Sequence, residues 1–376
     1  MKGTNLLVLA VALLMFPQLA QTLYSPALGD IGQAFAVGPE RAGQSLSVYF
    51  LAFAFGVVVW GRLCYHWGRR PVMLAGLSMY AGASVLALGV STFNGLLLAQ
   101  ALAAFGAAVG SVATQTLLRD RFQGAELAQV FSVMGIALAV SPALGLFSGA
   151  TLVQHFGYRG MLAGSLLLAL VLWGWCLCAL PETRPASLPT ASLRQTLGLM
   201  LRDTGLWRAV GLVGAFNIAL FSYYAVGPFV FERLGLSAAA FGYSGVLLAL
   251  GSGLGAWLNK RLLKRGMNGE QLVFTAAGIA LLGGLLVLML QGSWLFVWPM
   301  LLVVLAFGMA IPNVLGAALT AYHDRLGTAA ALFGLLYYLV IGAGLSLVAW
   351  LQDLGWSLLT CGLAALWLAV PRGVRS

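Results

Sequence analysis

Residues 61–74 read GRLCYHWGRRPVML and interrupt an otherwise apolar chain. The stretch holds the arginines Arg62, Arg69 and Arg70 together with His66. Long apolar runs lie on both sides of it, each near the length that a helix needs to cross a bilayer. We therefore predict a short polar loop between two membrane-spanning helices.

The composition of the whole chain supports a membrane protein. Of its 376 residues, 61% are hydrophobic and only 8% are charged, whereas an ordinary soluble domain carries about 25% charged residues. This predicts an all-α integral membrane protein with the lipid bilayer as a partner. The net charge of +10 is no sign of nucleic acid here, because the positions of charges in a membrane chain say more than their sum.

A helix of about 20 apolar residues crosses the hydrocarbon core, and this scale predicts twelve spans. The apolar run from Leu6 to Phe16, which follows Lys2, could pass for a signal peptide. However, it continues past Pro17 to Tyr24, so we assign it to the first span. The predicted spans are 5–25, 42–62, 71–91, 95–118, 127–152, 159–180, 206–230, 240–259, 271–291, 294–319, 327–350 and 352–370.

The basic residues orient these spans. Of the 20 lysines and arginines, only Arg41, Arg159 and Arg233 fall in loops on one side of the membrane, and the others fall on the opposite side. Basic loops remain in the cytoplasm. We therefore expect a multi-pass protein of the inner (plasma) membrane with both termini in the cytoplasm.

The chain divides into two halves of six spans. The longest polar stretch is 181–203, PETRPASLPTASLRQTLGLMLRD. Pro26 and Asp30 near the end of the first span match Pro228 and Glu232 near the end of the seventh, which suggests a duplicated unit. The predicted division is an N-terminal six-helix bundle (1–180), a cytoplasmic linker (181–205) and a C-terminal six-helix bundle (206–376).

Several motifs resemble those of the major facilitator superfamily, and specifically its bacterial drug-efflux branch of the bicyclomycin and chloramphenicol type. The resemblance implies two pseudosymmetric six-helix bundles that alternate access to a central site. The motifs that carry it are the Gly61 to Arg70 element, LYSPALGDI (23–31), LLRDRF (117–122), SPALGLFSGATLVQHFGYRG (141–160) and GPFVFERLGLS (227–237).

The resemblance also assigns residues to a gate on the cytoplasmic side. Arg119 and Asp120 are expected to join a charged cluster with the arginines of the 61–74 loop, while Pro142 and Gly149 belong to an antiporter motif of the fifth span. The full set of implied gating residues is Gly61, Gly68, Arg69, Arg70, Arg119, Asp120, Pro142 and Gly149.

The chain departs from the family pattern at several positions. Tyr65 stands where the loop motif has Asp, and His66 stands where it has Arg. We expect weaker or pH-sensitive contacts there, where a relative would pair its Asp with the helix start near Gly327 and Thr328. Further departures are Thr22 for a carboxylate, Gln100 for an arginine and Leu146 for a proline.

Uncharged polar side chains mark a candidate substrate site. In the first span they recur at helical spacing on one face, and by resemblance spans 1, 4, 7 and 10 line the central cavity. The same side chains could instead bond neighbouring helices, and tyrosines also favour the membrane interface. The candidate substrate-binding residues are Gln18, Gln21, Thr22, Gln115, Asn217, Phe221, Tyr224, Asn313 and Tyr337.

Proton coupling has no obvious carrier in the sequence. Proton-driven transporters use buried carboxylates, because burial raises the pKa of an acid, yet all ten acidic residues lie outside the predicted spans or at their ends. Asp30 and Glu232 are the coupling candidates, and the alternative is that they are solvated charges at helix ends.

Together these features predict a secondary transporter that acts as a monomer and exports a small amphiphilic organic compound, with protons as the coupling ion. An uptake permease for a sugar, metabolite or siderophore is the alternative. An enzyme is not expected, because the three histidines, His66, His155 and His323, fall in separate loops. No metal, cofactor or catalytic residue is expected, and the four cysteines are interpreted as small core residues.

Overall fold

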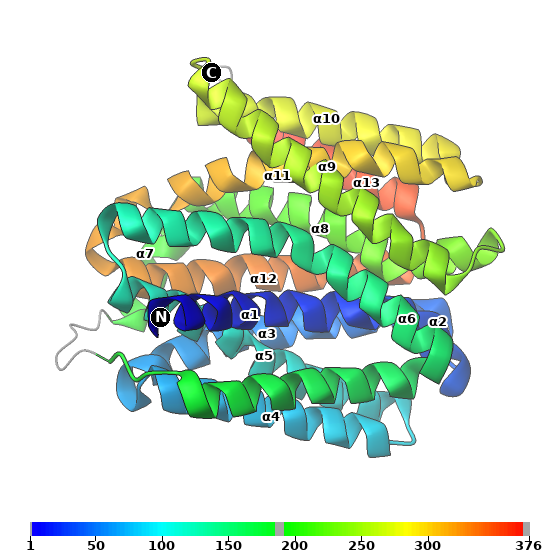
Figure 1. Ribbon diagram of the computed structural model, residues 1–376. Helices are drawn as coiled ribbons and strands as arrows, with labels where there is room; N and C mark the ends of the chain where they lie inside the picture. Colours follow the sequence, from blue (N-terminus) through cyan, green and yellow to red (C-terminus); the bar gives the residue numbers. More distant parts are fainter. Residues whose placement is uncertain (1, 185–191, 371–376) are drawn as a thin grey trace. The chain divides into compact units, whose positions relative to one another are not determined.

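The computed structural model describes residues 2–184 and 192–370, and the regular elements in these stretches are helical (Figure 1). Short 3₁₀ turns at 25–27, 294–296 and 320–325 join some of them. The α-helices are α1 (Lys2–Tyr24), α2 (Leu28–Ala34), α3 (Pro39–Trp67), α4 (Arg69–Gly89), α5 (Phe93–Arg121), α6 (Gly124–Ala179), α7 (Leu193–Arg202), α8 (Thr204–Arg233), α9 (Ala238–Lys264), α10 (Gly269–Leu290), α11 (Val297–Ala318), α12 (Leu326–Leu351) and α13 (Leu354–Ala369).

The helices confirm the twelve-helix membrane fold. Among the described residues, 10 helices are long and apolar enough to cross a bilayer, and α13 is a shorter apolar helix. Helix α6 contains two predicted spans, which are separated at Gly157, where φ is 64° and ψ is −171°. Glycine reaches this conformation because it has no Cβ. Gln352, with φ of 49°, separates α12 from α13.

The chain forms two compact units, residues 1–38 with 48–189 and residues 39–47 with 190–376. In the first, α1 packs along α6 and α4 packs along α5. In the second, α10 packs against α11 and α13, while α8 packs against α12 and α13. The first nine residues of α3 belong to the second unit, where the Ser47 hydroxyl donates to the Gly342 carbonyl at 2.7 Å.

The predicted linker at 181–205 contains an element that the sequence analysis did not predict. Residues 193–202 form helix α7, which packs against α12 within the second unit. Residues 185–191 of the linker and the C-terminal Arg372 and Arg375 lie outside the described residues.

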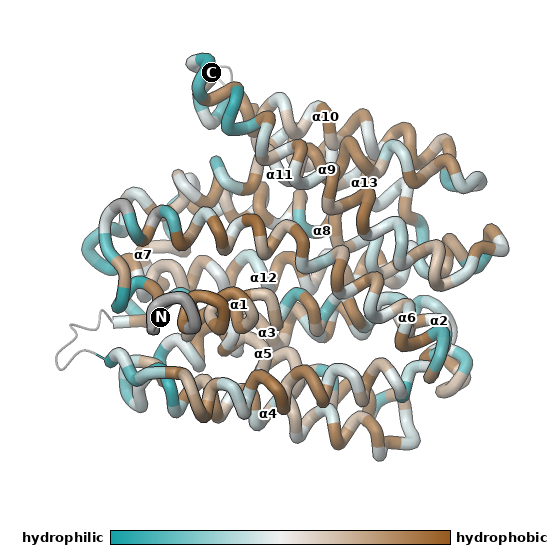
Figure 2. The backbone as a smooth tube through the Cα atoms, in the orientation of Figure 1, coloured by the Kyte–Doolittle hydropathy of each residue, from teal (hydrophilic) through white to brown (hydrophobic). Residues whose placement is uncertain are grey.

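Glycines allow the closest helix contacts. A Cβ at Gly149 of α6 would overlap the Leu23 carbonyl of α1, and a Cβ at Gly106 of α5 would lie 2.7 Å from the Gly76 carbonyl of α4. Small residues bring membrane helices together in this way because lipid supplies no hydrophobic drive for their association. The middles of the helices are apolar and the polar residues gather near their ends (Figure 2), as a bilayer requires.

Candidate functional site

The 61–74 stretch becomes a tight connection between α3 and α4 that buries Arg69. This side chain is only 1% exposed. Its Nε donates to Asp120 Oδ2 at 2.7 Å, and its Nη2 donates to Asp120 Oδ1 at 3.2 Å. Its Nη1 donates to the Cys64 carbonyl at 3.0 Å. Such a fork-to-fork pair fixes both side chains as well as balancing the charge.

Glu182, just beyond the end of α6, caps the start of α4. Its Oε1 accepts the backbone N–H of Arg69 at 3.0 Å, and its Oε2 accepts that of Arg70 at 3.1 Å. The first N–H groups of a helix have no partner within it and carry partial positive charge, so a carboxylate is favourable there. Gly68 is needed at this corner because its φ is 98° and because a Cβ would overlap the carboxylate.

The same carboxylate organises the chain that follows it. Glu182 Oε1 also accepts the backbone N–H groups of Thr183 at 2.9 Å and Arg184 at 2.8 Å. Burial acts to raise the pKa of Glu182, but the four backbone N–H donors outweigh it and hold the pKa below its ordinary value of 4.5. We refer to Gly68, Arg69, Asp120 and Glu182 as the Arg69 cluster.

Two further bonds connect the linker start to this cluster. The Thr183 hydroxyl donates to Asp120 Oδ2 at 3.0 Å, and Arg184 Nη1 donates to the His66 carbonyl at 2.7 Å. Local sequence did not predict roles for Glu182, Thr183 and Arg184, because their partners Arg69, Asp120 and His66 lie far away along the chain. The only signal was an acidic residue directly after a span, and that position is also typical of a solvated loop.

Arg119, an implied member of the charged cluster, lies apart from Asp120 and Arg69 in this structure. Arg119 is exposed and lies over the ring of Phe131, with its guanidinium carbon 5.8 Å from the ring centroid. Adjacent helix residues point about 100° apart, so Asp120 faces α4 and Arg119 does not. The other implied gating residues also lie in the first unit. Gly61 is buried in α3, and Arg70 Nη2 donates to the Leu177 carbonyl at 2.6 Å. In α6, Pro142 is half-buried and Gly149 contacts α1.

The two departures from the loop motif flank the cluster. The Arg69 guanidinium carbon lies 5.9 Å from the centroid of the Tyr65 ring, and the His66 side chain is exposed. The predicted weakening of the gate at Tyr65 and His66 stays a prediction.

The polar face of α1 is only partly used by contacts within the protein. Thr22 donates to the Gln18 carbonyl at 2.7 Å, and a Cβ at Gly145 of α6 would overlap its hydroxyl, so Thr22 lies in the contact between α1 and α6. In contrast, Gln18 Oε1 and Gln21 Nε2 are buried and have no hydrogen-bond partner among the described residues. Gln21 is 3% exposed.

Helix α5, which packs against α1, has a similar feature. The Thr114 hydroxyl is buried and has no partner within the described part of the chain, while Gln115 Nε2 donates to Ser111 Oγ at 3.3 Å. An unpaired buried polar atom costs about 1–3 kcal/mol. The neighbouring helices α1 and α5 therefore present polar atoms whose bonding capacity the fold leaves unused.

The candidates in the second unit are bonded mainly to their own helices and neighbours. Asn217 Nδ2 donates to the Val213 carbonyl at 2.7 Å. Asn313 Nδ2 donates to Asn259 Oδ1 at 2.7 Å, which joins α11 to α9 and favours the helix-bonding interpretation of this residue. The aromatic candidates are Phe221 and Tyr224, which are buried with ring centroids 5.7 Å apart, and Tyr337, which lies 4.3 Å from Tyr338.

The coupling candidates differ in environment. Asp30 is half-buried in α2 and lies beside the break in α6. A Cβ at Gly157 would be 3.8 Å from its Oδ2. Glu232 is exposed at the end of α8. Asp30 is therefore the less exposed of the two carboxylates.

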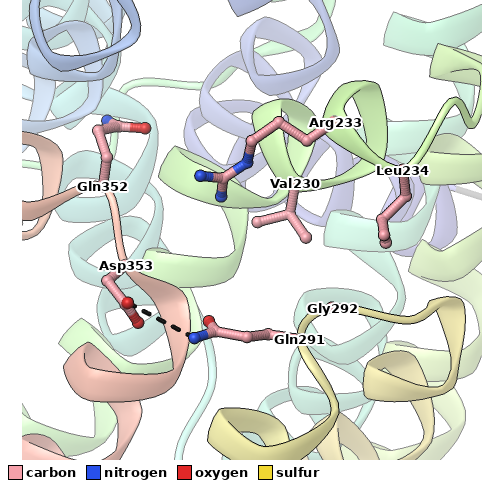
Figure 3. Close-up of a pocket in the computed structure, with 7 residues that line it drawn as sticks. All are labelled: Val230, Arg233, Leu234, Gln291, Gly292, Gln352 and Asp353. Atoms are coloured by element: carbon pink, nitrogen blue, oxygen red, sulfur yellow. Dashed lines mark hydrogen bonds between the residues drawn. The ribbon is translucent and has the colours of Figure 1, made fainter.

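A cavity of about 290 Å³ lies at the end of α8 in the second unit (Figure 3), where Val230, Arg233 and Leu234 line it together with Gln291, Gly292, Gln352 and Asp353. Figure 3 shows the guanidinium of Arg233 pointing toward Gln352 and Asp353. The carboxylate of Asp353 accepts the Trp356 N–H at 3.0 Å and the Gln291 side-chain amide at 3.5 Å. One carboxylate oxygen therefore caps the start of α13, and the other bonds the end of α10. In the described ranges, no three His, Cys, Asp or Glu residues gather into a group that could hold a metal.

Comparison with known proteins finds relatives that are similar in sequence and a solved structure that is similar in fold. An uncharacterized transporter of Rickettsia bellii is 31% identical over 89% of this chain and 87% of its own length. Multidrug resistance protein D of Escherichia coli is 27% identical over 94% and 91%, and a chloramphenicol resistance protein of Pseudomonas aeruginosa is 26% identical over 89% and 82%. The crystal structure of a D-xylose-proton symporter matches with a TM-score of 0.79 at 16% identity and covers 98% of this chain and 97% of its own.

The family model covers most of the chain. The Major Facilitator Superfamily model matches residues 10–345. The chain is a multi-pass secondary transporter, not an enzyme, and it belongs to the major facilitator superfamily.

Proposed function

We propose that this transporter exports small amphiphilic organic compounds that are neutral or zwitterionic, in exchange for protons. It acts as a monomer in the inner membrane, with both termini in the cytoplasm. The names of two relatives, a multidrug resistance protein and a chloramphenicol resistance protein, support efflux as the direction. The bias of basic residues toward one side supports the orientation.

The observation that carries the substrate class is the set of unused polar atoms on α1 and α5. Gln18 Oε1 accepts a hydrogen bond, Gln21 Nε2 donates one, and the Thr114 hydroxyl does either, yet none has a partner among the described residues. A solute with both donors and acceptors and no obligatory charge matches this set. Because the acidic residues lie at the ends of the helices, a permanent cation would find no fixed counter-charge.

The Arg69 cluster supports the proposed gate. Arg69, Asp120 and Glu182 bond the ends of α3, α5 and α6 to the start of α4. We propose that this rigid corner moves as one piece when the cytoplasmic side opens and closes. Asp30 is the preferred proton carrier, and Glu232 is the second candidate.

The substrate proposal is tested in vesicles of known orientation that are supplied with a compound panel and a pH gradient. Gln21→Leu and Thr114→Val should each raise the KM for a transported compound by about tenfold, the value of one hydrogen bond. Thr360→Val is the matched control, because its hydroxyl bonds within α13. An unchanged KM in both site variants, or a panel preference for permanent cations, would contradict the substrate class.

Direction and coupling are tested in the same assay. Accumulation on the cytoplasmic side would favour the uptake permease over the exporter. Transport that continues unchanged after the pH gradient collapses would exclude the proton as the coupling ion. If protons are coupled through Asp30, Asp30→Asn should abolish gradient-driven transport but retain exchange of substrate across the membrane. Unchanged gradient-driven transport in both Asp30→Asn and Glu232→Gln would reject the proposed carriers.

A further inference from the structure

Helix α7 is an amphipathic element that the transport function does not explain. Thr196 and Met200 are buried, and Leu193 and Leu197 pack against the core of the second unit. Arg194 and Arg202 are exposed. At 100° per residue, Arg194 and Leu201 share one flank of the helix, while Leu199 lies on the other flank.

The flank of Arg194 and Leu201 also exposes apolar surface. Leu201 is 49% exposed, and Trp207 in the first turn of α8 is 40% exposed. The Trp207 indole N–H donates to the Leu201 carbonyl at 3.1 Å, which holds the ring at the end of α7. We call Arg194, Leu201 and Trp207 the α7 flank. A tryptophan beside the start of a membrane-spanning helix is typical of the interface between bilayer and water.

The position of α7 is held by its junction with α8. Asp203 Oδ1 accepts the backbone N–H groups of Gly205 at 2.8 Å and Leu206 at 3.1 Å, and Asp203 Oδ2 accepts the Tyr322 hydroxyl at 3.0 Å. Both carboxylate oxygens are therefore occupied at the junction. Among the described residues, neither Arg194 nor Arg202 lies within ion-pair distance of an acidic side chain.

We propose that the α7 flank lies in the bilayer interface and binds the head group of an acidic phospholipid. Leu201 and the Trp207 ring cover the upper acyl chains, and the Arg194 guanidinium binds the phosphate. Amphipathic segments bind the interface in this way, with leucine and tryptophan at the acyl boundary and basic side chains at the anionic head groups. The flank is also continuous with α8, so bilayer is present next to it. With the orientation proposed above, this interface belongs to the cytoplasmic leaflet. The proposed lipid contact itself does not depend on that orientation.

The proposal is tested with the full chain in nanodiscs of phosphatidylcholine mixed with phosphatidylglycerol. A fluorophore is attached at Leu201→Cys in a Cys178→Ser background, because Cys178 is the most exposed of the four native cysteines. Bromine, which quenches the fluorophore, is placed on the acyl chains of one lipid at a time. A label at Leu250→Cys, 66% exposed on α9, confirms that each variant is folded and inserted.

The label at 201 should be quenched more strongly when phosphatidylglycerol carries the bromine than when phosphatidylcholine does. Arg194→Gln should reduce that preference by about fivefold, the value of one arginine near an acidic surface. Arg202→Gln, which removes an equal charge from another side of α7, should retain most of it. A label at 201 that is not quenched, a label quenched equally by both lipids, or an equal loss in both arginine variants would each overturn the proposal.

Discussion

At the scale of single residues, the molecule depends on an arginine that is almost completely buried. Arg69 is 1% exposed, and Asp120 and the Cys64 carbonyl accept hydrogen bonds from its guanidinium. Removing one partner of a buried pair leaves the other charge unpaired, which costs far more than the pair itself contributes.

Asp120→Asn is therefore expected to destabilise the protein by about 3–5 kcal/mol, measured as a lower melting temperature in detergent. Replacing both partners, in Arg69→Leu with Asp120→Leu, should recover much of the loss. The control is Asp324→Asn, which breaks an exposed pair with Arg325 and should leave the melting temperature unchanged. A loss in the double variant as large as in Asp120→Asn would contradict this account of the pair.

Glu182 gives a prediction that depends on pH. Its pKa is held below the ordinary value of 4.5, so the ionised carboxylate stabilises the fold fully above that value. The stabilisation is lost as the pH falls through the lowered pKa. Glu182→Ala should cost about 1 kcal/mol at neutral pH, as for other helix caps, and the difference from wild type should shrink in acid. Melting temperatures at several pH values test this, with the exposed Glu126→Ala as control. A difference that grows in acid would contradict it.

At the scale of elements, helix packing occupies some of the polar side chains that the sequence pattern assigns to a cavity. Thr22 packs in the contact between α1 and α6, and Asn313 forms a hydrogen bond from α11 to Asn259 of α9. Some residues that pattern alone assigns to a cavity therefore take part in helix packing, and which of them do depends on what each side chain meets on the neighbouring helix.

A double-mutant cycle separates the two roles of Asn313. If it clamps α11 to α9, Asn313→Ala and Asn259→Ala should change stability non-additively, with a coupling of about 1 kcal/mol. The two variants should also alter transport to the same extent. A rise in KM with Asn313→Ala that Asn259→Ala does not reproduce would show instead that Asn313 contacts the substrate.

At the scale of the whole molecule, the uneven distribution of basic residues predicts which ends of the helices face the cytoplasm. In a Cys178→Ser background, Ser91→Cys after α4 should react with a membrane-impermeant maleimide in intact cells. Gln123→Cys before α6 should react only after the cells are permeabilised. Ser91 and Gln123 are both exposed, so side-chain burial does not account for a difference. The reverse pattern would invert the proposed orientation.

Much of the fold follows from local sequence. Whether a segment inserts into a bilayer depends on its own run of apolar residues, because every backbone group in lipid must be bonded within the helix. The twelve spans could therefore be predicted along the chain. Even the break between the fifth and sixth spans lies at Gly157, within the gap that hydropathy left between 152 and 159. The same local character predicted the polar α3–α4 connection.

The tertiary structure decided which partners the polar residues meet. The bond between Glu182 and the Arg69 N–H joins residues 113 positions apart, and the choice of Asp120 over Arg119 depends on the rotation of α5 against α4. Helix α7 was hidden in a stretch that composition marked as linker. These outcomes depend on the rotation and distance of packed helices, which one-dimensional patterns do not contain. Local hydropathy specifies which segments cross the membrane, whereas helix packing specifies which charges are buried together.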